Sequence, residues 1–105
     1  PLVLEDRVTV GHSVTLHGCT IRQHVLVGMG ATIMDGADVG PESLVGAGCL
    51  VPEGMKVPHR VLVVGVPARI VRPLTDAEVA GLHESADNYI RYSRNYRGAV
   101  LPAET

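Results

Sequence analysis

The chain has 105 residues, enough for one small domain, and 46% of them are hydrophobic although it contains no Phe, no Trp and only three Tyr. Its formal net charge of −2 argues against a nucleic-acid-binding protein, which usually needs a basic face. No stretch approaches the roughly 20 apolar residues of a membrane-spanning helix, and no signal peptide is visible. Cys19 and Cys49 lack the spacing of a disulfide framework, so we expect buried thiols and a cytoplasmic protein.

An aliphatic residue returns at every sixth position through residues 4–63. These anchors are Leu4, Val10, Leu16, Ile21, Val27, Ile33, Val39, Val45, Val51, Val57 and Val63, with one shorter step between Leu16 and Ile21. An amphipathic helix would need returns at three and four residues, and a half-buried strand would need alternation. A six-residue repeat instead predicts a parallel β-helix, in which each unit is a short strand and a bend. Stacked columns of aliphatic side chains would also explain why the core lacks large aromatic residues.

The chain divides into three predicted segments: a β-helix over residues 1–68, a linker and C-terminal α-helix over 69–98, and a tail over 99–105. Thr75 and Glu78 form a capping box for the helix, which we expect to stop near Gly98. Its apolar stripe should cover a flat side of a β-helix, its own or a neighbour's. The stripe contains Val79, Leu82, Ala86, Tyr89, Ile90 and Ser93. The repeat is already running at Leu4, so we expect further coils before Pro1 in the natural protein.

Two histidines, His12 and His17, lie five residues apart where the repeat loses one residue. Imidazoles fit a repeat coil poorly, so the pair is a candidate metal site, although chance clustering on the surface is the alternative. His24 lies two units beyond His12 and falls on a different face, His59 lies in a Pro-containing bend, and His83 lies on the predicted helix. We interpret these three as solvated or packing histidines.

The sequence resembles the gamma-class carbonic anhydrases and their close homologues over about residues 4–96. The resemblance is specific in Gly11-His12 followed by His17-Gly18-Cys19 and in Gly28-Met29-Gly30-Ala31, and it continues in Gly46-Ala47-Gly48 and Ser85-Ala86-Asp87-Asn88-Tyr89. Gly65-Val66-Pro67-Ala68-Arg69 is less specific, because it also resembles the broad group of hexapeptide acyltransferases.

The resemblance implies a mainly β fold: a left-handed parallel β-helix, an exception to the right-handed crossover rule, with the C-terminal α-helix packed on it. It implies a homotrimer with zinc at the subunit interfaces, held by three histidines from two chains, of which His12 and His17 match two. Iron or cobalt would also accept imidazole ligands. The third histidine of the family would precede Pro1, so the site is expected to be incomplete here.

The activity implied is the reversible hydration of a small molecule, carbon dioxide, by metal-activated water. Asn88 and Tyr89 match the Asn-Tyr pair that approaches the metal-bound ligand in relatives, and they are the candidate catalytic residues. Packing on the helix stripe is the alternative for Tyr89.

Two other functions stay open. A hexapeptide-repeat acyltransferase would use acyl-coenzyme A as donor and one histidine as general base. A non-catalytic trimeric scaffold would use the fold alone. Bound metal should separate these functions from a carbonic anhydrase.

Overall fold

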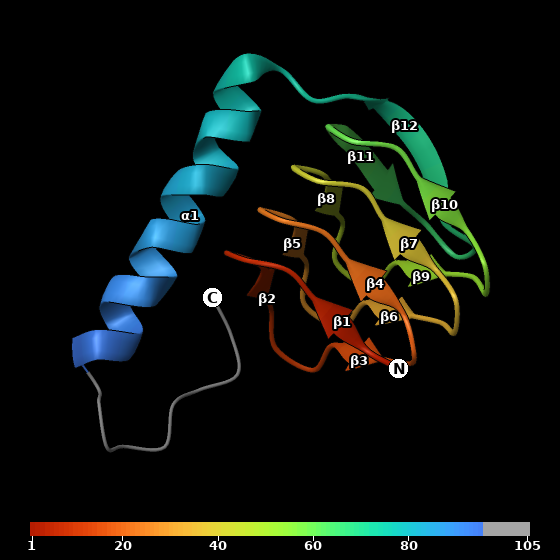
Figure 1. Cartoon of the computed structure of the whole chain (residues 1–105). Coiled ribbons are helices and arrows are strands. Elements are labelled where there is room, and N and C mark those ends of the chain that lie inside the picture. Colours follow the sequence, from red (N-terminus) through yellow and green to blue (C-terminus); the bar gives the residue numbers. More distant parts are fainter. Residues whose placement is uncertain (96–105) are drawn as a thin grey trace.

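The protein is described here by a computed structural model, which gives the backbone of residues 1–95 and the side chains of residues 1–88. Twelve strands precede one helix along this part of the chain (Figure 1). The strands are β1 Val3–Leu4, β2 Thr9–Val10, β3 Thr15–Leu16, β4 Thr20–Ile21, β5 Leu26–Val27, β6 Thr32–Ile33, β7 Asp38–Val39, β8 Leu44–Val45, β9 Leu50–Val51, β10 Lys56–Val57, β11 Val61–Val64 and β12 Arg69–Pro73, and the helix is α1 Asp76–Asn95.

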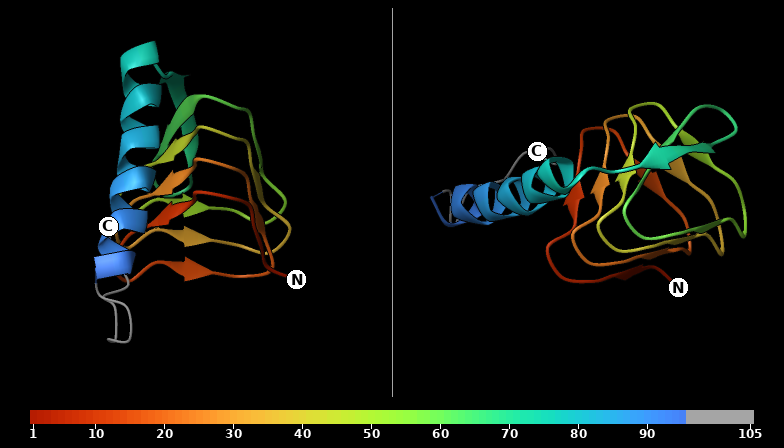
Figure 2. Two further views of the ribbon diagram at one scale, coloured as in Figure 1. Left: turned by 60° about the vertical axis from the view of Figure 1, so that its left-hand side comes forward. Right: turned by 90° about the horizontal axis from the view of Figure 1, so that it is seen from above.

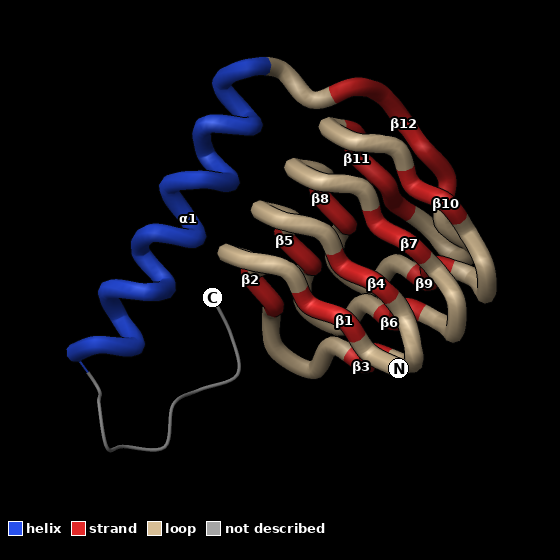
Figure 3. Tube along the Cα trace, viewed as in Figure 1, coloured by secondary structure: helices blue, strands red, loops and turns tan. Residues whose placement is uncertain are grey.

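The strands form three sheets that are the faces of a solenoid of stacked coils (Figure 3). The orders are β1-β4-β7-β10, β12-β11-β8-β5-β2 and β3-β6-β9. Every pairing is parallel except that of β11 with β12. Ile33 pairs with Val51, 18 residues on, whereas Leu16 pairs with Ile33, only 17 residues on. The predicted β-helix of hexapeptide repeats is therefore confirmed, and the slip in the repeat is a coil that is one residue short.

The core is a set of aliphatic columns inside the coils. The second residue of each central strand points inward, and these anchors from Ile21 to Val51, together with Val63, are fully buried. Smaller interior positions hold Ala31, Ala37 and Cys49, also buried. The two cysteines are unbonded thiols whose pKa is raised by burial, as expected for packing residues.

Strand β12 was not expected from the sequence, which suggested a linker there. It turns back on β11 and pairs antiparallel with it, with a register shift between Leu62 and Val63. All five of its residues are exposed. The last coil therefore ends in a hairpin before the chain leaves for α1.

Helix α1 covers one face of its own solenoid (Figure 2). The capping box forms: the Thr75 N–H donates to the Glu78 carboxylate at 2.9 Å, and the Glu78 N–H donates to Thr75 Oγ1 at 3.1 Å. Leu74, Val79 and Leu82 are buried against Leu26, Leu44 and Leu62, which point outward from β5, β8 and β11. The stripe is confirmed as far as Ala86, which is 2% exposed. Its later side chains, the end near Gly98 and the tail lie outside the described residues.

One corner of the solenoid faces α1 and is built from four non-glycine residues one coil apart. Arg7, His24, Glu42 and Arg60 all have a left-handed backbone, with φ between 55° and 59°. We call this column the helix-facing corner. Left-handed φ costs a side-chain-bearing residue about 1–2 kcal/mol, so this corner needs a compensating interaction.

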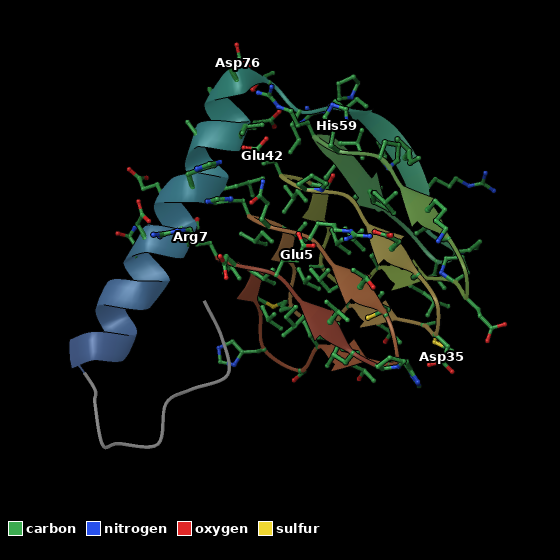
Figure 4. The ribbon with its side chains drawn as sticks, viewed as in Figure 1. Glu5, Arg7, Asp35, Glu42, His59 and Asp76 are labelled. Carbon is green, nitrogen blue, oxygen red and sulfur yellow. The ribbon has the colours of Figure 1, made fainter. Side chains whose placement is uncertain are left out.

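Contacts with α1 offset part of that cost. Arg7 pairs with Asp87 at 2.7 Å and Arg60 with Asp76 at 3.0 Å. Figure 4 shows Arg7, Glu42 and Asp76 along this boundary. Between the two ion pairs, the Nε2 of His83 on α1 lies 2.6 Å from a carboxylate oxygen of Glu42. The helix is thereby held at several levels of the solenoid. No helix in the described part of the chain is both long and apolar enough to cross a bilayer.

Candidate functional site

The two candidate metal ligands lie at opposite ends of β3 in the first complete coil. His12 follows β2 and precedes β3, and His17 directly follows β3. Both side chains are exposed. The structure therefore brings them to the same coil but to two neighbouring corners, one at each end of β3.

The corner of His12 is shaped by close stacking of backbone. Gly11 is buried, and a Cβ there would lie 2.8 Å from the backbone nitrogen of Met29 in the next coil. The Gly30 N–H donates to the His12 carbonyl at 2.8 Å, and Ser13 takes the left-handed conformation that turns the chain. Gly11 thus lets the coils approach closely enough for these hydrogen bonds to set the backbone of His12.

The corner of His17 is the short one. Three residues, 17–19, join β3 to β4, whereas four residues, 34–37, join β6 to β7 in the next coil. The Cys19 N–H donates to the His17 carbonyl at 2.8 Å and closes a tight turn. The Gly18 N–H donates to the Asp35 carboxylate at 2.8 Å. The slip noticed in the sequence is therefore the feature that sets the backbone around His17.

The donor chemistry of the pair fits zinc, because neutral imidazole is a common zinc ligand and an exposed ring is accessible to the ion. The number of donors is short of a complete site. Within the residues that the structure describes, no group of three or more His, Cys, Asp or Glu side chains could hold a metal ion. A full three-imidazole site would need ligands beyond those that this part of a single chain places together.

Asn88 is exposed in the second half of α1. Its neighbour Asp87 pairs with Arg7, which belongs to the first coil. The helix therefore carries Asn88 to the level of the coil that holds His12 and His17. The side chain of Tyr89, the other candidate catalytic residue, lies outside the described side chains.

The remaining described histidines have the packing or solvated roles that the sequence suggested. His59 is exposed. His24 and His83 stack with ring centroids 3.7 Å apart and planes 11° apart. Burial, and then the nearby His83, lower the pKa of His24. The sequence analysis did not identify the contact from Asp35 to Gly18. The one indication of it in the sequence is that Asp35 lies one coil after the shortened turn.

Comparison with known proteins gives a consistent result. No family model matches the chain. It is 45% identical over 89 residues to gamma carbonic anhydrase 1, mitochondrial, of Arabidopsis thaliana, covering 85% of this chain and 32% of that protein. It is 48% identical over 96 residues to the protein YrdA of Escherichia coli, covering 91% and 52%.

Among solved structures, a hexapeptide transferase family protein from Anaplasma phagocytophilum superposes with a TM-score of 0.84 at 38% identity, covering 90% of this chain and 61% of that one. The chain thus spans between about a third and about half the length of the two curated relatives. The shared identity and the repeat solenoid together place these 105 residues in the gamma carbonic anhydrase family of hexapeptide-repeat proteins.

Proposed function

We propose that the protein of which these residues are part is a zinc-dependent carbonic anhydrase of the gamma type, and that His12 and His17 are two of its metal ligands. The observation that carries the proposal is the exposed His12–His17 pair flanking β3 in the single short coil. The relatives named carbonic anhydrase support it, since their identity to this chain extends over most of its length.

The proposed site lies between chains of a homotrimer. Because His12 and His17 occupy neighbouring corners of the same coil, they face different directions around the solenoid. Each histidine would then lie at a different subunit interface, and at each interface a second chain would supply the metal ligands that one chain lacks. When bound there, zinc would supply Lewis-acid chemistry, lowering the pKa of water to about 7 so that hydroxide would be available near neutral pH.

The chain's own residues hold and shape this site. Gly11 and Gly18 keep the two corners compact, so that each imidazole leaves a rigid coil rather than a loose loop. We propose that Asn88, whose neighbour Asp87 pairs with Arg7 of this coil, orients the small-molecule substrate through its amide. Asn88 can have this role only while α1 is packed against the solenoid.

Zinc content and carbon dioxide hydration test the proposal. His12→Ala and His17→Ala should each lose bound zinc and hydration activity while keeping the oligomeric state of the unmutated protein in sedimentation. His59→Ala is the matched control, because His59 is also exposed but lies in a different bend. Full zinc content in both ligand variants would show that the ligand assignment is wrong.

A hexapeptide-repeat acyltransferase is the second candidate, favoured by the superposition on the transferase family protein from Anaplasma phagocytophilum. Calorimetric titration with coenzyme A separates the two. Coenzyme A binding by a zinc-free protein would support the acyltransferase. A protein that binds neither zinc nor coenzyme A would support the non-catalytic trimeric scaffold.

A further inference from the structure

The backbone hydrogen bonds of the shortened corner, residues 17–19, are complete only because of one side chain from the next coil. The His17 N–H donates to the Ile33 carbonyl at 2.9 Å, and the His17 carbonyl accepts from Cys19. The Gly18 carbonyl accepts from the Gly36 N–H at 2.8 Å. The Gly18 N–H has a side-chain acceptor instead, Oδ1 of Asp35, at 2.8 Å.

The two corners stacked on it do not use such a contact. In the next two coils the Ala37 N–H donates to the Met34 carbonyl, and the Met55 N–H donates to the Pro52 carbonyl, closing ordinary four-residue turns. With one residue fewer, the corner of His17 closes through Cys19 to His17 instead. Because the short coil has one residue fewer, the Gly18 N–H is satisfied by the Asp35 carboxylate of the next coil.

Glu53 shows what an acidic residue at this position does elsewhere. It lies 18 residues after Asp35, one coil further on, and both are exposed carboxylates in the same column. The corner below Glu53 is full-length and is closed by its own backbone. Glu53 is therefore a natural comparison residue with the charge and place of Asp35 but without its contact to a short turn.

We propose that Asp35 is a positioning residue for His17: its carboxylate holds Gly18 and thereby sets the direction in which the His17 imidazole leaves the corner. This inference rests on the proposed function for its consequence in metal binding. A carboxylate accepting a backbone N–H forms a charge-assisted hydrogen bond, stronger than a neutral one. Gly18 suits the contact because a Cβ there would come within 3.3 Å of the same Asp35 oxygen.

The test compares Asp35→Ala, Asp35→Asn and Glu53→Ala in the full-length protein of which these residues are part. Zinc affinity is measured by competition with a chromophoric chelator, well below the melting temperature. The Gly18 amide and His17 ring signals are followed by NMR without metal. We expect Asp35→Ala to weaken zinc binding about tenfold, in the range found for residues that orient metal ligands, and to shift both signals. Asp35→Asn, whose amide oxygen can still accept, should keep most of the affinity, and Glu53→Ala all of it.

Three outcomes would overturn the inference: wild-type zinc affinity in Asp35→Ala, an equal loss in Glu53→Ala, or an Asp35→Asn variant as weak as Asp35→Ala, which would indicate an effect of charge alone. If the unmutated full-length protein binds no zinc, the proposed function fails separately. The NMR arm then decides on Asp35, because unchanged His17 signals in Asp35→Ala would refute positioning and altered ones would support it.

Discussion

The imidazole rings of His24 and His83 stack face to face, 3.7 Å apart, across the boundary between the solenoid and α1. A carboxylate oxygen of Glu42 lies 2.6 Å from Nε2 of His83 in this pair. The Nδ1 atom of His24 is buried, and in the described part of the chain it is the one buried side-chain nitrogen or oxygen without a hydrogen-bond partner. Such an arrangement suits a neutral His24 ring, because a proton there would be poorly solvated and close to a second imidazole.

Acid should therefore weaken the docking of α1. Burial, His83 and Arg7 lower the pKa of His24, whereas Glu42 and Asp87 oppose this. With the folded pKa below the unfolded value of about 6.5, the unfolded state binds the proton first. The stabilisation is present above about pH 6.5 and is lost as the pH falls through the folded pKa. The slope is at most about 1.4 kcal/mol per pH unit for one proton.

Urea unfolding between pH 8 and pH 5 measures this slope. His24→Leu should flatten it, whereas His59→Asn, at an exposed position beside Arg60, should leave it unchanged. Below about pH 4.5 a second loss is expected, since the hydrogen bond from His83 lowers the pKa of Glu42. A stability that does not change between pH 7 and pH 5 in the unmutated chain would contradict the neutral His24.

Replacing Arg7 should separate backbone strain from the ion pair with Asp87. Arg7→Ala loses the pair and keeps the left-handed φ of 59°, whereas Arg7→Gly loses the pair and relieves the backbone. The Arg7→Gly variant should therefore be more stable to unfolding than the Arg7→Ala variant by about 1 kcal/mol. Because both charged side chains are largely exposed, the pair itself should contribute no more than about 0.2–1 kcal/mol and should weaken with salt. A double-mutant cycle with Asp87→Ala at two salt concentrations measures this coupling.

Two glycine-to-alanine changes should have opposite signs. At Gly28 a Cβ would lie 2.7 Å from the backbone nitrogen of Ala47, so the coils must separate, at a cost of about 1–3 kcal/mol. At Gly81, on the exposed side of α1, nothing lies within 4 Å, and alanine should gain up to about 1 kcal/mol in helix propensity. Chemical denaturation of both variants checks the signs. A tolerated Gly28→Ala would show that the coils are not packed as closely as described.

Removing the helix cap should cost about 1 kcal/mol, within a range of roughly 0.5–2. Thr75→Ala deletes the hydroxyl that accepts the Glu78 N–H, and Thr75→Ser should restore it. The hydrogen bond from Arg72 and then that from Thr75 lower the pKa of Glu78 to about 2. The contribution of Glu78 is thus present above about pH 4.5 and is lost as the pH falls towards 2. Thermal unfolding of both variants at pH 7 and pH 3 tests the cap.

The repeat predicted the solenoid because the six-residue spacing of the aliphatic residues is visible in the sequence, and one such residue per strand is buried. Ile33 and Val39 are buried for the reason that their spacing suggested, and Thr75 and Glu78 form the cap that their spacing indicated. The short step after Leu16 likewise corresponded to a real change of register.

The helix-facing corner could not be predicted in the same way. Its residues differ in charge and size, and what Arg7 and Glu42 share is a backbone conformation and a neighbouring helix, both set by tertiary packing. The contact from Asp35 to Gly18 joins residues that are 17 apart in the sequence. It depends both on the stacking of one coil on the next and on the loss of one residue from the shorter coil. Strand β12 was missed because its run of Arg69, Ile70, Val71 and Arg72 does not continue the six-residue rhythm.

The hairpin of β11 and β12 has a consequence for self-association. A parallel sheet with an open edge offers unpaired N–H and carbonyl groups on which another molecule can add strands and start a fibre. Here the final parallel strand is already occupied, and the strand that occupies it carries Arg69 and Arg72 and ends in Pro73, which has no N–H to donate. Although Ile70 and Val71 are exposed, the charges and the proline protect this end of the sheet against polymerisation.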